Sequence, residues 1–251
     1  MNEASLKELG LWPLWQRRDA AQATPPAPPA QPDEQPAGLH AGGVACATDT
    51  RNEEIMRMDW QTLQRSVAGC TACPLAKTRT RTVFGVGAPN SDWLFVGEAP
   101  GAEEDARGEP FVGQAGKLLD NMLSAIGLKR GRNVCIANVV KCRPPGNRNP
   151  EAEEMEACAP YLARQIELIR PKLIVALGRI AAQRLLASDN TIASLRGRLH
   201  QHLGIPLIVT YHPAYLLRNL PDKAKAWQDL CLALKTMQDM QSTETPDHKE
   251  P

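Results

Sequence analysis

Four short runs of consecutive apolar residues, spaced along the middle of the chain, form its clearest pattern. They cover residues 93–96, 134–137, 173–177 and 207–210 and are rich in leucine, isoleucine and valine. A strand that is covered on both faces is apolar at every position, and such strands are typical of parallel sheets. The pattern therefore predicts four buried parallel strands.

Segments with apolar residues at helical spacing lie between and after these runs, at residues 118–126 and 224–234 among others. Asn149 and Pro150, followed by an acidic stretch, favour the start of another helix. Pro160 is expected to break or kink that helix. Strands that alternate with helices predict an α/β fold.

Polar side chains follow the predicted strands where each one ends. Glu98 follows the first strand, Asn138 the second, Arg179 the third and His212 the fourth. Ligands of open α/β sheets bind at the carboxyl edge, so these segments point to one crevice. Ordinary loop polarity is the alternative, and it accounts less well for a Glu, an Asn and a His at three strand ends.

The segment after the first strand, residues 97–119, contains five carboxylates and one aromatic residue among five glycines. Glycines let the backbone approach a flat or anionic ligand closely. Glu98, Glu104 and Asp105 would be costly near a core unless they bind something or take part in chemistry. This loop is therefore the leading candidate for a site.

The chain has 251 residues, of which 43% are hydrophobic, and this is enough for one sizeable core. No apolar run approaches the roughly 18 residues of a membrane span, and the N-terminus has no apolar signal region, so we expect a cytoplasmic protein without membrane contact. Residues 23–37 are dominated by Pro, Ala and Gln and predict a linker. We expect a disordered extension over residues 1–55, a folded domain over 56–236 and a disordered tail over 237–251.

The first residues contain a short amphipathic stretch within the extension. Leucines and tryptophans recur over residues 6–15, and two arginines follow, so residues 6–18 could dock on the groove of a protein partner. A frayed terminus with incidental tryptophans is an equally good explanation.

Charge is distributed unevenly along the chain. Residues 57–235 hold 24 Lys and Arg against 16 Asp and Glu, which gives +8, whereas the whole chain carries only +1. The flanks are therefore acidic, at −7. A basic core suits a phosphate-rich partner, although many enzymes have a similar excess.

Seven cysteines, in a chain without a secretory signal, favour metal ligation over a disulfide framework. Cys70 and Cys73 form a CxxC pair, and Cys142 and Cys158 supply two more thiolates. Four thiolates can hold a [4Fe-4S] cluster or a structural zinc ion, while the pair alone would also fit a redox motif. The remaining cysteines are interpreted as bystanders: Cys46, Cys135 and Cys231.

Five motifs occur together and in order: CTACPLAKTRTRTVFG, GEAPGAEEDARGEPFVGQAG, NVVKCRPPGNRNP, a fourth cysteine sixteen positions after the third, and HPAYLLR. In these motifs the chain resembles the family 4 uracil-DNA glycosylases, the iron-sulfur branch of the uracil-DNA glycosylase superfamily in bacteria and archaea. The resemblance runs from about Met58 to Leu234. It implies a central four-stranded parallel sheet between helices, in a three-layer sandwich, and the excision of uracil from DNA at the start of base excision repair.

The resemblance also implies a cofactor and partners. Cys70, Cys73, Cys142 and Cys158 would hold a [4Fe-4S] cluster, which we expect to be mainly structural because glycosidic hydrolysis is not redox chemistry. The partner would be uracil-containing DNA, bound by a monomer that associates with the nucleoid while it acts.

Three residues fit the chemistry of uracil excision. His212 can donate a hydrogen bond to uracil O2 as negative charge develops there, as a neutral or a protonated ring. Asn138 can accept from N3–H and donate to O4, a pattern that cytosine reverses. Phe111 would stack on the extruded base, although plain packing against the sheet is the alternative.

The carboxylates and the DNA contacts complete the expected site. Glu98 and Glu104 are both candidates for positioning water or opposing positive charge on the sugar, and Asn147 is expected to hold Glu104 by a hydrogen bond. Gly97 and Ala99 are also expected to contact the substrate. After His212, Leu217 would fill the vacated base stack and Arg218 would meet a phosphate.

Other readings are kept open. One is a non-catalytic or covalent uracil-DNA-binding iron-sulfur protein of the same superfamily. Covalent capture uses a histidine in a basic insert after the second strand, and here residues 141–150 contain none. Another is an α/β enzyme that acts on a phosphate ligand, but the chain has no Walker lysine or dinucleotide fingerprint.

Overall fold

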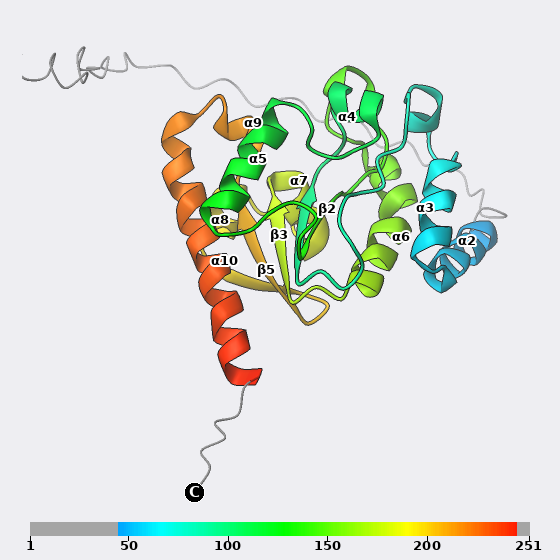
Figure 1. Ribbon diagram of the computed structural model, residues 1–251. Coiled ribbons are helices and arrows are strands. Elements are labelled where there is room, and N and C mark those ends of the chain that lie inside the picture. The colour runs from blue at the N-terminus through cyan, green and yellow to red at the C-terminus, as the bar shows by residue number, and fades with distance from the viewer. Residues whose placement is uncertain (1–44, 245–251) are drawn as a thin grey trace, which may run out of the picture. The chain divides into compact units, whose positions relative to one another are not determined.

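The computed structural model describes residues 45–244 (Figure 1). The amphipathic stretch at residues 6–18 and the Pro-rich segment at 23–37 lie outside the described residues. No helix among residues 45–244 is long and apolar enough to cross a membrane.

A mostly parallel sheet of five strands forms the centre, in the order β2-β1-β3-β5-β4. The strands are β1 (Trp93–Gly97), β2 (Val134–Asn138), β3 (Leu173–Leu177), β4 (Leu199–His202) and β5 (Ile205–Thr210). The prediction of an α/β fold is confirmed, and the four predicted parallel strands are β1, β2, β3 and β5.

The expectation of four strands misses β4, which pairs antiparallel with β5 at the edge of the sheet. Its sequence LHQH has one side chain in two partly covered, and Leu199 is 51% exposed. A half-exposed edge strand does not produce a continuous apolar run, so the pattern that identifies buried strands cannot detect it.

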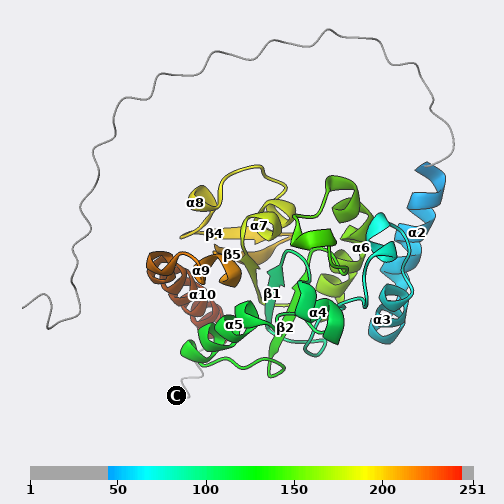
Figure 2. The ribbon, with the colours of Figure 1, turned by 90° about the horizontal axis from the view of Figure 1, so that it is seen from above.

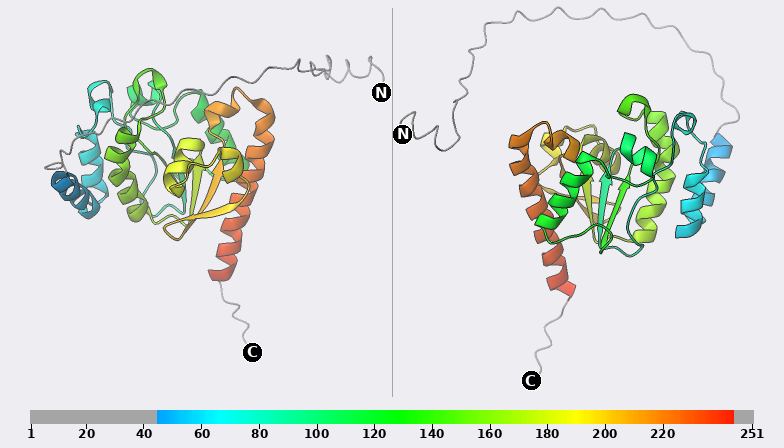
Figure 3. Two further views of the ribbon diagram at one scale, coloured as in Figure 1. Left: turned by 180° about the vertical axis from the view of Figure 1, so that it is seen from behind. Right: turned by 45° about the horizontal axis from the view of Figure 1, so that its top comes forward.

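Helices cover both faces of the sheet, which gives three layers (Figures 1 and 2). The helices are α2 (Ala45–Arg57), α3 (Trp60–Ala68), α4 (Ala102–Arg107), α5 (Gln114–Ala125), α6 (Ala152–Ile169), α7 (Arg179–Leu186), α8 (Ile192–Leu195), α9 (Pro213–Leu216) and α10 (Lys223–Glu244). Short 3₁₀ turns lie at η1 (Pro74–Lys77), η2 (Pro145–Asn147) and η3 (Leu220–Asp222). One face packs against α6 and α7, with α2 and α3 outside α6, and the other packs against α5 and α10, as the views in Figure 3 also show.

Helix α6 begins later than predicted and is not broken at Pro160. It begins after Glu151, where the Glu154 carboxylate accepts a hydrogen bond from the Glu151 N–H at 2.8 Å, two residues after the expected start at Asn149. It also continues through Pro160 without a break. Buried side chains on both sides of this proline, among them Cys158 and Tyr161, pack on one core and outweigh the one backbone hydrogen bond that proline removes.

The folded part is longer than residues 56–236. Helix α2 begins at Ala45 and buries Ile55, which is 1% exposed, and α10 runs to Glu244 with Met237 2% exposed. Both expected boundaries therefore fall inside helices. The polar composition of these helix ends hides the few apolar residues that dock them on the domain.

Candidate active site

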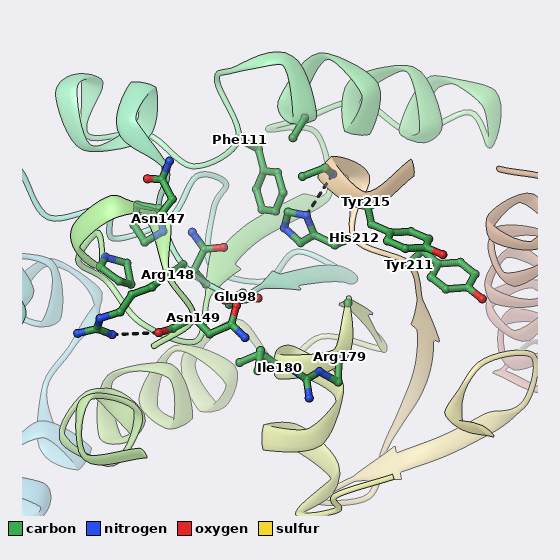
Figure 4. Close-up of a pocket in the computed structure, with 18 of the residues that line it drawn as sticks. Glu98, Phe111, Asn147, Arg148, Asn149, Arg179, Ile180, Tyr211, His212 and Tyr215 are labelled. Atoms are coloured by element: carbon green, nitrogen blue, oxygen red, sulfur yellow. Dashed lines mark hydrogen bonds between the residues drawn. The ribbon is translucent and has the colours of Figure 1, made fainter. Parts of the chain in front are cut away.

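A cavity of about 840 Å³ opens at the carboxyl edge of the sheet. It brings together most of the predicted site residues, which lie at or after the ends of β1, β2 and β5: Glu98, Ala99, Glu104, Phe111, Asn138, Asn147, His212 and Arg218 (Figure 4). Two predicted residues do not line it. Gly97 lies beneath Phe111 and Asn138, and Leu217 is 42% exposed at the end of α9.

His212 caps α9 and is held in one tautomer. Its Nδ1 accepts a hydrogen bond from the Ala214 N–H at 3.2 Å, so the proton of the neutral ring is on Nε2. Burial lowers the pKa of His212 to about 4, although the charge of Glu104 opposes this. The neutral ring is therefore the form present at pH 7, and it offers an Nε2–H donor to the pocket.

Phe111 forms a wall beside this donor. Its ring centroid lies 5.4 Å from that of His212, with an angle of 32° between the planes (Figure 4). A Cβ on Gly97 would lie 2.6 Å from the Phe111 ring and 2.5 Å from Asn138 Oδ1. Only glycine leaves room at the end of β1 for these two side chains to approach each other.

Asn138, the last residue of β2, is 1% exposed, and within the described part of the chain its Oδ1 has no hydrogen-bond partner. A buried acceptor without a partner costs about 1–3 kcal/mol. Since Asn138 lines the cavity, a ligand that donates an N–H there would remove this cost.

Of the three carboxylates singled out in the glycine-rich loop, Glu104 and Asp105 accept hydrogen bonds from backbone N–H groups. Glu104 accepts hydrogen bonds from the N–H groups of Gly101, Val112 and Gly113 at 3.1, 2.9 and 3.1 Å. Asp105 is 3% exposed and accepts from the N–H groups of Thr80 and Arg81. Glu104 therefore closes its own loop, and Asp105 ties the loop to the segment before β1.

Asn147 does not bond to Glu104 in the structure, in contrast to the expectation. Its Oδ1 accepts instead from Arg143 Nε at 2.7 Å, within the turn after β2. The carboxylate oxygens of Glu104 accept from the backbone of its own loop. Glu104 and Asn147 therefore form hydrogen bonds within two different loops.

Among the described residues, Glu98 lines the cavity and its carboxylate accepts no such hydrogen bond from backbone. Burial raises its pKa above the ordinary value of 4.5, and the charge of Arg179 opposes the rise. Arg179 and Ile180 also line the cavity, on the other side of Glu98 from Phe111 (Figure 4). From the sequence, Arg179 was identifiable only by its position directly after the third predicted strand.

The four cysteines singled out by the sequence line one small cavity together with Arg79 and Lys141. Arg79 donates to Cys142 Sγ at 3.1 Å, and the Lys141 N–H donates to Cys158 Sγ at 3.3 Å. Burial raises the pKa of Cys158 to about 11, while the charge of Lys141 lowers it. Cys135 and Cys231 lie elsewhere, on β2 and α10.

Comparison with known proteins gives a consistent result. Residues 84–231 match the family model of the uracil DNA glycosylase superfamily. A type-4 uracil-DNA glycosylase from Archaeoglobus fulgidus is 48% identical over 161 residues, which cover 61% of this chain and 80% of that protein. The corresponding enzyme from Thermotoga maritima is 46% identical over 169 residues, or 66% of this chain and 85% of the relative.

The match extends to the type within the superfamily. A type-4 uracil-DNA glycosylase from Pyrobaculum aerophilum is 43% identical over 183 residues, which cover 70% of this chain and 93% of that protein. A type-5 enzyme from the same organism is 32% identical over 170 residues. With a pocket of this composition and a match of this extent, the chain belongs to the uracil-DNA glycosylase superfamily and, within it, to the type-4 uracil-DNA glycosylases.

Proposed function

We propose that the protein extrudes uracil from DNA and hydrolyses its N-glycosidic bond, the first step of base excision repair. Membership of the family supports this activity. The observation in the structure that carries it is the unpartnered Asn138 Oδ1, buried in a pocket beside the Phe111 ring and the Nε2–H of His212. Uracil matches these three groups in turn: its imide N–H matches Asn138 Oδ1, its flat ring matches Phe111, and the carbonyl that gains charge matches the Nε2–H of His212.

Cleavage of the bond between N1 and the sugar leaves a uracil anion and an oxocarbenium-like deoxyribose. His212 stabilises the anion by donating Nε2–H to O2, and this contact strengthens as the bond breaks. The neutral ring is sufficient for this role, because the Nε2–H can donate a hydrogen bond although the ring carries no positive charge. The Ala214 N–H fixes the tautomer that the donation requires.

Asn138 selects uracil. Its Oδ1 accepts the N3–H and its amide N–H₂ donates to O4, whereas cytosine presents an acceptor at N3 and donors at its 4-amino group. Cytosine would therefore leave buried polar groups unpaired, and this makes rejection strong. Phe111 stacks on the extruded ring and excludes water from one of its faces.

Glu98 is the carboxylate that acts on the sugar side, where it positions the attacking water and opposes the developing positive charge. Glu104 contributes by holding the loop that carries Phe111, since its oxygens are occupied by backbone N–H groups. This division of roles explains two neighbouring glutamates without making both catalytic.

The rate of uracil excision should fall as the pH drops through the raised pKa of Glu98, because the protonated carboxyl can neither activate water nor oppose charge. His212 stays neutral down to about pH 4, so it adds no titration above that value. Single-turnover rates between pH 4.5 and 8 should show one acid limb, and Glu98→Gln should be slow and flat over the same range. If Glu98→Gln kept the same fall in rate at low pH, that fall would have to come from the titration of another group.

DNA binding follows from the same edge of the molecule. Extrusion of the base costs a few kcal/mol of unstacking. Leu217, exposed at the end of α9, fills the vacated stack, and Arg218 at the rim of the pocket contacts a phosphate. We propose that the protein acts on DNA as a monomer in the cytoplasm.

A glycosylase assay tests the proposed function directly. The protein is incubated with an oligonucleotide that contains one uracil, and an otherwise identical uracil-free strand serves as the control. Release of free uracil, together with an alkali-labile abasic site in the strand, would support the proposed glycosylase activity. Tight binding without release would favour a non-catalytic member of the superfamily, and a covalent adduct would favour capture of the DNA.

The four cysteines fit a [4Fe-4S] cluster as the cofactor. The four thiols line one cavity, which is compatible with a site that they share. Four thiolates can hold either a [4Fe-4S] cluster or a zinc ion. Membership of the type-4 enzymes, the iron-sulfur branch of the superfamily, favours the cluster.

The charges around the cysteines support the same assignment. Lys141 is 1% exposed, and its Nζ donates to Asn138 O at 2.7 Å and to Gln165 Oε1 at 2.5 Å, which are neutral acceptors. A buried cation requires a nearby anion. Thiolates on Cys142 and Cys158, bound to iron, would supply it. When bound, the cluster would tie the CxxC segment to α6 and to the loop after β2.

The purified protein is expected to be brown and to contain about four irons per chain when it is isolated without oxygen. Cys142→Ala should lose the colour and much of the soluble yield, because the ligand and its contact with Arg79 are both removed. Cys231→Ala, on the exposed side of α10, is the matched control and should keep both. Stoichiometric zinc without iron in metal analysis would contradict the assignment.

A further inference from the structure

Arg130 lies on the turn between α5 and β2 and is not among the residues that line the pocket. Its guanidinium nevertheless binds the loop that carries Phe111. Nη1 donates to Pro110 O at 2.6 Å, and Nη2 donates to Phe111 O at 2.7 Å. Nε donates to the Asp120 carboxylate on α5 at 3.0 Å, so all sides of the planar group are engaged.

The backbone that Arg130 holds is in an unfavourable conformation. Phe111 has φ of 54°, in the left-handed region, which is rare for a bulky residue and costs about 1–3 kcal/mol. A residue keeps this conformation only where its surroundings impose it. The two short hydrogen bonds from Arg130 hold the carbonyls of Pro110 and Phe111. These two carbonyls flank the bonds whose rotations are φ and ψ of Phe111.

Two further contacts fix the same turn. A Cβ on Gly116 of α5 would lie 1.8 Å from Phe111 O, so α5 packs its glycine directly against this carbonyl. On the following peptides, Glu104 accepts from the N–H groups of Val112 and Gly113. The carboxylate of Glu104 thus binds the N–H groups of the turn while the guanidinium of Arg130 binds its carbonyls.

We propose that Arg130 is a positioning residue for uracil excision, because it holds the Phe111 ring in the orientation that faces His212 and receives the extruded base. The inference rests on the proposed function. Arg130 touches neither base nor DNA in this role, and its effect passes entirely through Phe111. Asp120 orients the guanidinium and balances its charge.

Arg130→Gln is expected to lower the single-turnover rate of uracil excision by about ten- to a hundredfold, the usual cost of displacing a positioned group by about 1 Å. Asp120→Asn should have a smaller effect, because the bonds from Arg130 to the two carbonyls remain. Arg184→Gln is the matched control: Arg184 forms a bidentate pair with Glu156 on the surface and should leave the rate unchanged.

A double-mutant cycle separates positioning from general stability. If Arg130 acts through Phe111, then Phe111→Ala combined with Arg130→Gln should be no slower than Phe111→Ala alone. Phe111→Leu replaces Phe111→Ala in the cycle if the alanine variant does not fold. Melting temperatures of all variants establish that each is folded at the assay temperature.

Two results would overturn the inference: a rate for Arg130→Gln equal to that of the parent, or losses that add fully in the cycle. The first would make Arg130 a surface anchor that contributes only stability, and the second would give it an effect independent of Phe111. Either result leaves the proposed function intact, since the parent protein with uracil-containing and uracil-free strands tests that function separately.

Discussion

His212→Ala is expected to slow uracil excision by about a hundredfold or more, while its affinity for uracil-containing DNA stays close to that of the parent. The reason is that the Nε2–H of His212 meets a carbonyl oxygen of modest charge in the bound substrate and an oxygen with increased negative charge in the transition state. An interaction that strengthens along the reaction lowers the rate when it is removed, with little effect on ground-state binding.

The decisive comparison measures both quantities on one preparation, with single-turnover rates for chemistry and a binding titration for affinity. His200→Ala is the matched control, because the His200 ring contacts Leu195 O beside β4 and lies outside the pocket. A parallel loss of binding would make His212 a docking residue. An unchanged rate would remove it from the mechanism.

Asn138→Asp is expected to reduce uracil excision by a comparable factor and to relax discrimination against cytosine. Asn138 is buried, so a carboxylate in its place loses the donor for O4 and brings an unsolvated charge. The same carboxylate can accept from the 4-amino group of cytosine, which the amide N–H₂ cannot. The expected change is therefore in selectivity as well as in rate.

Excision from oligonucleotides with uracil or cytosine at the same position gives the ratio of rates. Asn190→Asp, on the exposed loop after α7, introduces the same change in charge away from the pocket and should leave that ratio unaltered. A variant at Asn138 that excised uracil at the parent's rate would show that another group reads the base.

Much of the fold could be predicted from local sequence. Four strands were identifiable because both their faces are buried and their residues are apolar, apart from Asn138 and Thr210 at the strand ends. Strand β4 was not, since its half-exposed LHQH has meaning only beside β5. The ends of α2 and α10 were missed for the same reason, because their docking depends on a few apolar residues whose partners are distant in sequence.

The candidate site divides in the same way. The types of residue at the strand ends indicated Asn138 and His212, because parallel strands bring their carboxyl ends to one edge whatever their loops do. The protonation state of His212 followed only from its burial and from the Ala214 N–H. Spacing suggested four cysteine ligands, but only the packing of α6 brought Cys158 to the cavity that the other three line.

Sequence alone therefore determined which chemistry the chain carries: the amide, the imidazole, the aromatic ring and the thiols, each placed by a strand end or a motif. Tertiary structure decided which of several equivalent groups bonds to backbone and which faces the pocket. Glu98 and Glu104 are the same residue type in one loop, yet Glu104 is occupied by backbone N–H groups and Glu98 faces the pocket. Arg130 left no signal in the sequence, because it acts on backbone carbonyls about twenty residues away, and every residue type has a carbonyl.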